Sequence, residues 1–151
     1  MVALPCVKIL AASVPDSLKI INRGIEIVPM NAIAALVEQA KENFETQYFT
    51  VSERSAAETA IDRIHYFAGR ICAKKAVLKT LGIKPNQDAF WLDIEVQCLP
   101  TGEPSVVLHG RCREIASGVG LTTLLLSISH VTAYAAASVI ALGEARVKGL
   151  S

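Results

Sequence analysis

The stretch A-G-R-I-C-A-K-K-A-V-L-K-T-L-G, residues 68–82, places four cationic side chains on an otherwise almost entirely apolar segment. Its composition, with Gly82 and Pro85 at its end, predicts a helix over about 65–81. A helix so rich in Ala, Val and Leu is expected to be buried, and buried helices rarely carry unpaired cations. The cations therefore need an explanation. They are Arg70, Lys74, Lys75 and Lys79.

Two interpretations of these cations are open from the residues alone. At about 100° per residue, Arg70 and Lys74 form one pair on the helix, and Lys75 and Lys79 form another. The simpler interpretation, which the residues alone favour, is two rims of long side chains that reach water past the apolar faces. The alternative is a phosphate clamp, with lysines as movable point charges and Arg70 as a planar fork.

The whole chain has the composition of one globular domain. It has 151 residues, of which 52% are hydrophobic, and a net charge of +1. That charge provides no overall field for nucleic acid or an anionic membrane. No apolar run approaches the roughly 20 residues of a membrane span, and the first eighteen residues resemble an extension rather than a signal peptide. The four cysteines, none in a C-x-x-C pair, predict reduced thiols in a cytoplasmic protein.

The order of periodic segments predicts an α+β fold. Expected strands cover 19–28, 91–99, 105–109, 121–130 and 133–142, and the alanines of the last also permit a helix. Expected helices cover 30–44, 51–63, 65–81 and 110–118. Thr50 and Glu53 match a capping box at the start of the second helix. We therefore expect a folded domain over 19–143, between an N-terminal extension (1–18) and a short tail (144–151).

Two polar clusters lie on expected strands. Glu26, in G-I-E-I (24–27), is flanked by isoleucines and needs a partner or a metal unless it faces water at a strand edge. In S-I-S-H (127–130), alternation places Ser127 and Ser129 on one face and His130 on the other. A lone strand-end histidine is more often structural than catalytic. A serine hydrolase is excluded, because the chain has no G-x-S-x-G elbow and adjacent strand residues point apart.

Taken together and in order, several motifs resemble one family over about residues 19–143. The motifs are G-I-E-I (24–27), F-T-x-x-E (49–53), F-A-G-R-x-x-A-K-x-A-x-x-K-x-x-G (67–82), D-I-E-V (93–96), G-x-P (102–104), S-I-S-H (127–130) and Y-A-A-A (134–137). They resemble the holo-[acyl-carrier-protein] synthases of the 4′-phosphopantetheinyl transferase superfamily. The resemblance implies an antiparallel sheet packed against a long central helix, and a homotrimer with sites between subunits. It also implies transfer of the phosphopantetheine arm of coenzyme A to a serine of an acyl carrier protein, with Mg²⁺ on the pyrophosphate.

The resemblance also implies roles for individual residues. Glu26 occupies the position of one Mg²⁺ ligand, and Lys75 occupies the position of the second, where the family has glutamate. Lys74 and Lys79 keep two lysines that contact phosphate and assist the attacking serine. His130 keeps the histidine at the nucleotide end of coenzyme A. Ser129 and Arg70 are expected to join the residues that bind coenzyme A.

Other positions depart from the family. Glu103 replaces the lysine of its G-K-P turn. The first helix, where the bacterial enzymes have arginines that meet the carrier protein, has Glu38, Glu42 and Glu45 against Lys41 alone. These glutamates would repel an acidic partner.

Three hypotheses follow from these departures. The first is an active, divergent transferase, in which Lys75 supplies the positive charge of the missing metal and pairs with Glu26. The second is a non-catalytic protein that binds coenzyme A or phosphopantetheine. The third is a trimeric assembly protein. The transferase is the best single prediction, although fold alone does not settle function.

Overall fold

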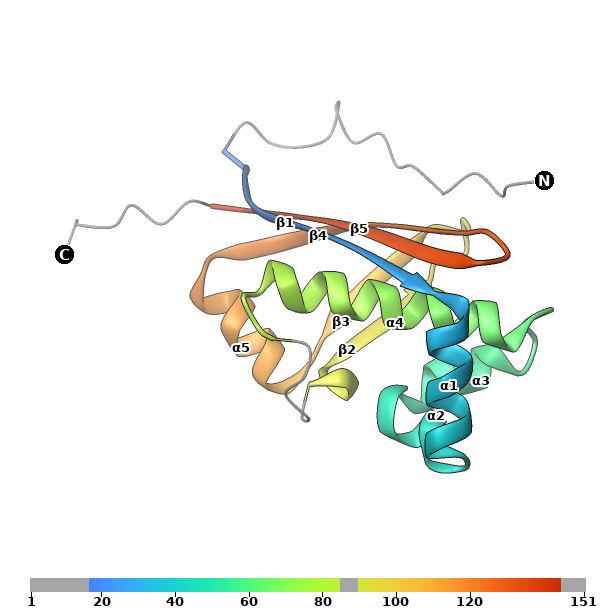
Figure 1. The fold of residues 1–151 in the computed structure, drawn as a ribbon. Helices are drawn as coiled ribbons and strands as arrows, with labels where there is room; N and C mark the ends of the chain where they lie inside the picture. Colours follow the sequence, from blue (N-terminus) through green and yellow to red (C-terminus); the bar gives the residue numbers. More distant parts are fainter. Residues whose placement is uncertain (1–16, 85–89, 145–151) are drawn as a thin grey trace.

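The computed structural model describes residues 17–84 and 90–144. Helix α4 (Arg63–Thr80) runs along one face of an antiparallel sheet of β1 (Lys19–Pro29), β5 (Tyr134–Gly143) and β4 (Leu121–His130), in the order β1-β5-β4. In Figure 1 the other face of this sheet is not covered by any helix of the described residues. The predicted fold, an antiparallel sheet packed against a long central helix, is confirmed.

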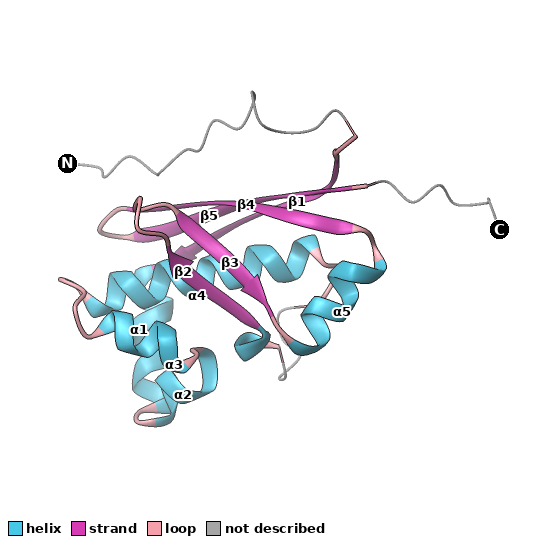
Figure 2. Ribbon diagram, turned by 180° about the vertical axis from the view of Figure 1, so that it is seen from behind, coloured by secondary structure: helices cyan, strands magenta, loops and turns pink. Residues whose placement is uncertain are grey.

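The remaining elements surround α4. A hairpin of β2 (Ile94–Cys98) and β3 (Pro104–Leu108) forms a second sheet, preceded by the short helix η1 (Trp91–Asp93). Figure 2 shows this hairpin on the same side of the three-stranded sheet as α4, opposite the outer face of that sheet. Helices α1 (Met30–Ala40), α2 (Asn43–Tyr48) and α3 (Val51–Ala57) gather at one end, and α5 (Gly110–Gly118) lies at the other.

The expected elements are present, with shifted boundaries. The helix expected over 30–44 ends at Ala40, because Lys41 has a positive φ of 49° that turns the chain before α2. The helix expected over 51–63 ends at Ala57, and α4 starts at Arg63 behind an Asp62 cap. The alanine-rich segment is a strand, because β5 is paired on both sides, by β1 and β4.

Two glycines determine how α4 sits. A Cβ at Gly24 would lie 2.5 Å from the Ala76 carbonyl oxygen, so only glycine permits this approach of β1 to α4. Gly82, with φ of 74°, ends α4 as predicted, because this left-handed conformation costs glycine little. The motif residues of β1 and α4 are thereby held in contact.

Further expectations concern the helix cap, the thiols and membrane spans. The predicted capping box is confirmed: the Thr50 hydroxyl accepts from the Glu53 amide, and the Glu53 carboxylate accepts from the Thr50 amide. Among the described cysteines, Cys72, Cys98 and Cys112 are free thiols. Cys6 and the rest of the expected extension up to residue 16 lie outside the described residues. Over the described ranges, no helix is both long and apolar enough to span a bilayer.

Candidate functional site

The first candidate site lies where β1 meets the C-terminal half of α4. Glu26 points toward α4, and its Oε2 lies 2.6 Å from Nζ of Lys79. Lys79 also donates a 3.1 Å hydrogen bond to the Ile25 carbonyl. Oε2 is buried and accepts no aligned hydrogen bond, so the charge of Lys79 is what compensates it. This places Glu26 and Lys79 in direct contact, at a position that water still reaches through the half-exposed lysine.

Lys75 belongs to the same face of α4. It follows Cys72 by one turn and precedes Lys79 by another, and Cys72 donates a 3.1 Å hydrogen bond to the Glu26 carbonyl. Burial raises the pKa of Cys72 to about 12, the charge of Glu26 adds to the shift, and the charge of Lys75 opposes it. Both charges therefore act on one thiol. The expected ion pair of Glu26 with Lys75 is not present, since Glu26 pairs with Lys79. We call Glu26, Lys75 and Lys79 the lysine site.

Lys74 lies in the core instead of facing a phosphate. Its side chain has no exposed surface, and Nζ donates to the Tyr48 carbonyl, the Glu53 carboxylate and the Trp91 carbonyl at 2.7, 2.8 and 2.9 Å. An ammonium group has three protons, so every donor is used. Burial lowers the pKa of Lys74, and the carboxylate of Glu53 opposes that shift. Lys74 thus joins α4 to α2, α3 and η1.

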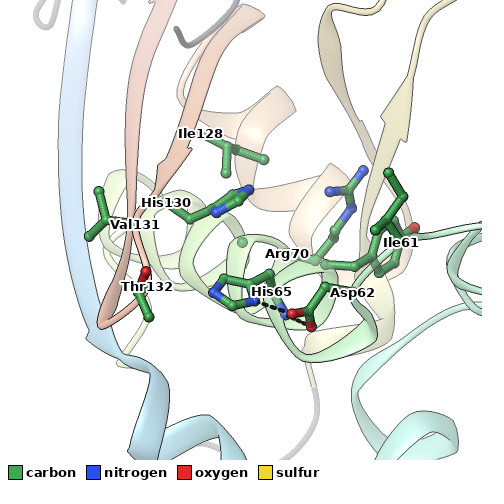
Figure 3. Close-up of a pocket in the computed structure, with 10 residues that line it drawn as sticks. Ile61, Asp62, His65, Arg70, Ile128, His130, Val131 and Thr132 are labelled. Atoms are coloured by element: carbon green, nitrogen blue, oxygen red, sulfur yellow. Dashed lines mark hydrogen bonds and ion pairs between the residues drawn. The ribbon is translucent and has the colours of Figure 1, made fainter. Parts of the chain in front are cut away.

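A cavity of about 640 Å³ lies between the N-terminal half of α4 and the end of β4 (Figure 3). The rings of His65 and His130 both line it and contact each other, with centroids 5.1 Å apart and ring planes tilted by 47°. Asp62 caps α4 through the His65 amide, and its Oδ2 lies 2.7 Å from Nδ1 of His65. The His65 amide and ring lower the pKa of Asp62. We call this the histidine pocket.

Arg70 also lines the histidine pocket, whereas Ser129 does not. The guanidinium carbon of Arg70 lies 3.8 Å from the centroid of the Tyr66 ring, and its buried Nε has no hydrogen-bond partner among the described residues. Because residues alternate along β4, Ser129 points to the face opposite His130, as its position beside Ala136 of β5 requires. Arg70 and His130 are therefore brought together, and Ser129 is separated from them.

Comparison with known proteins identifies this arrangement. Residues 23–136 match the family model described as the 4′-phosphopantetheinyl transferase superfamily. The chain is 34% identical over 121 residues to the holo-[acyl-carrier-protein] synthase of Koribacter versatilis, covering 80% of this chain and 97% of that protein. It is 37% identical over 118 residues to that of Dehalococcoides mccartyi, covering 78% and 95%. The chain belongs to the holo-[acyl-carrier-protein] synthase family.

Solved structures agree with this assignment to the holo-[acyl-carrier-protein] synthase family. The Plasmodium yoelii synthase superposes with a TM-score of 0.72 at 28% identity, covering 83% of this chain and 97% of that one. The Helicobacter pylori synthase, solved in complex with coenzyme A, superposes with a TM-score of 0.68 at 27% identity, covering 79% and 98%.

The lysine site does not fit the Mg²⁺ that the family implies. Its one carboxylate, Glu26, is already paired with Lys79, and the second ligand position holds the ammonium of Lys75. Over residues 17–84 and 90–144, no group of three His, Cys, Asp or Glu side chains is placed to hold a metal ion. Mg²⁺ requires oxygen donors at about 2.1 Å, and two ammonium groups repel it.

Sequence reasoning missed two functional contributions. The capping residue Glu53 is also the buried counter-ion of Lys74, and it accepts a 2.8 Å hydrogen bond from the Val96 amide. The sequence contains a signal for this role, because a lysine on a buried, apolar helix requires a buried anion as its partner. His65 was not singled out either. Its position three residues after Asp62, at the start of α4, marks a cap, but no local pattern shows that His130 would face it.

Proposed function

We propose that this chain transfers the 4′-phosphopantetheine arm of coenzyme A to a serine of an acyl carrier protein. The observation that carries the proposal is the lysine site: on the fold of this family, Lys79 pairs with the Glu26 carboxylate of β1, and Lys75 lies one turn earlier on the same helix. Such a cluster suits a pyrophosphate, since ammonium groups bind phosphate oxygens as mobile point charges. The relatives named above support the reaction, because they are holo-[acyl-carrier-protein] synthases.

The proposed reaction replaces the phosphoanhydride bond of coenzyme A with a phosphodiester bond to serine. The serine Oγ attacks the phosphorus that bears pantetheine, and the bond from that phosphorus to the bridging pyrophosphate oxygen breaks. Adenosine 3′,5′-bisphosphate leaves with the electron pair. Lys75 and Lys79 stabilise the charge that develops on the pyrophosphate oxygens. Glu26 is the carboxylate at this position and takes the serine proton.

The histidine pocket supports binding of the nucleotide end of coenzyme A. Arg70, His65 and His130 provide nitrogen donors around one cavity, and within the described residues the buried Arg70 Nε has no partner. A phosphate group is a strong acceptor for such donors. In this arrangement Lys74 does not contact coenzyme A and serves the core.

The proposal includes an acyl carrier protein partner and a homotrimer in the cytoplasm. The outer face of the large sheet carries Ile25 and Ile27, which are 63% and 62% exposed. Neighbouring exposed isoleucines on a sheet face that no helix of the described residues covers favour association with a second chain. For the carrier, the acidity of the first helices is less than the sequence suggested, because Arg63 pairs with Glu45.

One observation favours a second function, coenzyme A binding without transfer: a cation occupies the position where the family implies a second metal ligand. Incubation with coenzyme A and a panel of apo carrier proteins, followed by intact-mass measurement, separates the two functions. Transfer predicts the phosphopantetheine mass increment on at least one carrier. Calorimetric binding of coenzyme A without the increment on any carrier would support the second function, and no binding would leave assembly alone.

A further inference from the structure

We propose that Lys75 replaces the divalent cation, so that this chain binds the pyrophosphate of coenzyme A without Mg²⁺. The inference rests on the proposed function and concerns the same lysine site. It starts from the disagreement between the residues present and the metal that the family implies. Glu26 is the single carboxylate of the lysine site, where the family implies two, and Lys75 occupies the position of the second.

The formal charges of the two arrangements are equal. Two carboxylates, one lysine and a divalent cation, as the family implies, carry a net single positive charge. Glu26, Lys75 and Lys79 carry the same net charge with no metal. Adding Mg²⁺ here would raise the charge of a partly buried site by two, which is unfavourable without further carboxylates. The substitution of Lys75 thus removes a ligand and supplies a cation in one step.

Lys75 lies at the lysine site and has no partner among the described residues, so it is available to act as that cation. Its side chain is half-buried, and within the described residues it makes no hydrogen bond and no ion pair. Its neighbours one turn away on α4 both contact Glu26, since Cys72 is bonded to the Glu26 carbonyl and Lys79 is paired with the Glu26 carboxylate. The carboxylate is thus committed to Lys79, which leaves the ammonium of Lys75 for an incoming anion.

The ammonium differs from Mg²⁺ in a way that can be measured. Lys75 donates hydrogen bonds to phosphate oxygens and needs no chelatable ion. Coenzyme A binding should therefore be insensitive to EDTA. A charge-reversed Lys75→Glu chain regains two carboxylates beside Lys79 and should bind coenzyme A better with Mg²⁺ than without it.

The test is calorimetry with coenzyme A on the full chain, in EDTA and in millimolar MgCl₂. For the unchanged chain we expect dissociation constants that agree within about twofold, and for Lys75→Glu we expect binding in EDTA to weaken by about tenfold or more, with recovery in MgCl₂. Lys75→Gln should weaken binding equally in both buffers. Lys84→Glu, an exposed charge reversal beyond the end of α4, should change neither value.

The outcomes separate the two proposals. Tighter binding by the unchanged chain in MgCl₂, by about tenfold or more, overturns the metal-free site and leaves the transferase proposal standing. Equal binding of Lys75→Glu in both buffers also overturns it. Absence of binding by the unchanged chain in both buffers overturns both proposals. Thermal melting of each variant shows that it is folded, so that lost binding is not confused with lost structure.

Discussion

Replacing Lys74 by methionine should destabilise the fold. It should not directly weaken the proposed binding of pyrophosphate at the lysine site. The ammonium of Lys74 is fully buried and has three acceptors, of which Glu53 is the only charged one. Methionine keeps most of the side-chain volume and removes the charge and all three donors. Glu53 then keeps the amides of Thr50 and Val96 but has a buried, uncompensated negative charge.

The expected loss follows from this geometry. Breaking a buried ion pair from one side costs about 3–5 kcal/mol. The two carbonyls that lose their donor contribute to the same loss, at about 1–3 kcal/mol each where they stay dry. A domain of this size has a total free energy of unfolding of about 5–15 kcal/mol. Lys74→Met should therefore remove a third or more of it.

Urea unfolding followed by tryptophan fluorescence measures this loss. Trp91 is the sole tryptophan, is 9% exposed, and packs against Tyr48 with ring centroids 5.3 Å apart. Comparisons are made at one protein concentration, since association raises apparent stability. Lys84→Met, which removes an exposed lysine, should shift the free energy of unfolding by less than about 0.5 kcal/mol.

A double-mutant cycle with Glu53→Gln isolates the pair. We expect a coupling energy of about 2 kcal/mol or more between the two positions, in the upper part of the range for contacting residues. A loss below about 1 kcal/mol for Lys74→Met, together with weaker coenzyme A binding, would refute this reasoning. That result would restore Lys74 to the phosphate-binding role that the family resemblance implied.

Three further predictions test the packing, the cap and the assembly. Gly24→Ala should destabilise the fold by about 1–3 kcal/mol in the same urea assay, because its Cβ would meet the Ala76 carbonyl at 2.5 Å, and an unchanged midpoint would contradict the packing of β1 on α4. Asp62→Ala should cost about 1 kcal/mol near neutral pH through the lost cap. The pKa of Asp62 in the folded chain lies below its ordinary 3.8. The contribution of its charge to the free energy of unfolding is therefore fully present above pH 3.8 and is lost as the pH falls through the folded-state pKa. A pH series of unfolding should show the gap between native chain and Asp62→Ala narrowing below about pH 4, while a constant gap would refute the charge contribution. Ile25→Glu, on the sheet face that no described helix covers, should convert the proposed trimer to monomers in sedimentation equilibrium, and a trimer that persists in this variant would contradict an interface at this face.

The fold was largely predictable because its local signals agree with its tertiary contacts. The capping box at Thr50, the left-handed Gly82 and the alternation of β4 each stabilise the element that the sequence predicted. The misplaced boundaries have local causes that composition does not reveal. Lys41 turns the chain with a positive φ, a conformation that a lysine seldom adopts and no pattern predicts.

The site was less predictable, because a helical wheel gives directions and not neighbours. The wheel paired Arg70 with Lys74 on one rim, yet Arg70 lies over Tyr66 in the histidine pocket and Lys74 is in the core. What separates them is Glu53, which α3 brings to Lys74 alone. The counter-ion comes from another element, 21 positions away in sequence, so the charge run could not by itself show which lysine is buried.

The close approach at Gly24 explains why the charge pattern of α4 bears on the proposed chemistry. Gly24 brings β1 against Ala76 and Thr80, and two residues further along β1 the same contact places Glu26 beside the preceding turn of α4. Lys75 lies one turn before Lys79 on this face of α4, and its charge and that of Glu26 both act on the Cys72 thiol. A glutamate at position 75 would add a second negative charge to the lysine site and favour a bound cation, whereas Lys75 adds a positive charge beyond that of Lys79, which already pairs with Glu26. This packing is the reason that the metal dependence of coenzyme A binding by Lys75→Glu tests the proposed metal-free site.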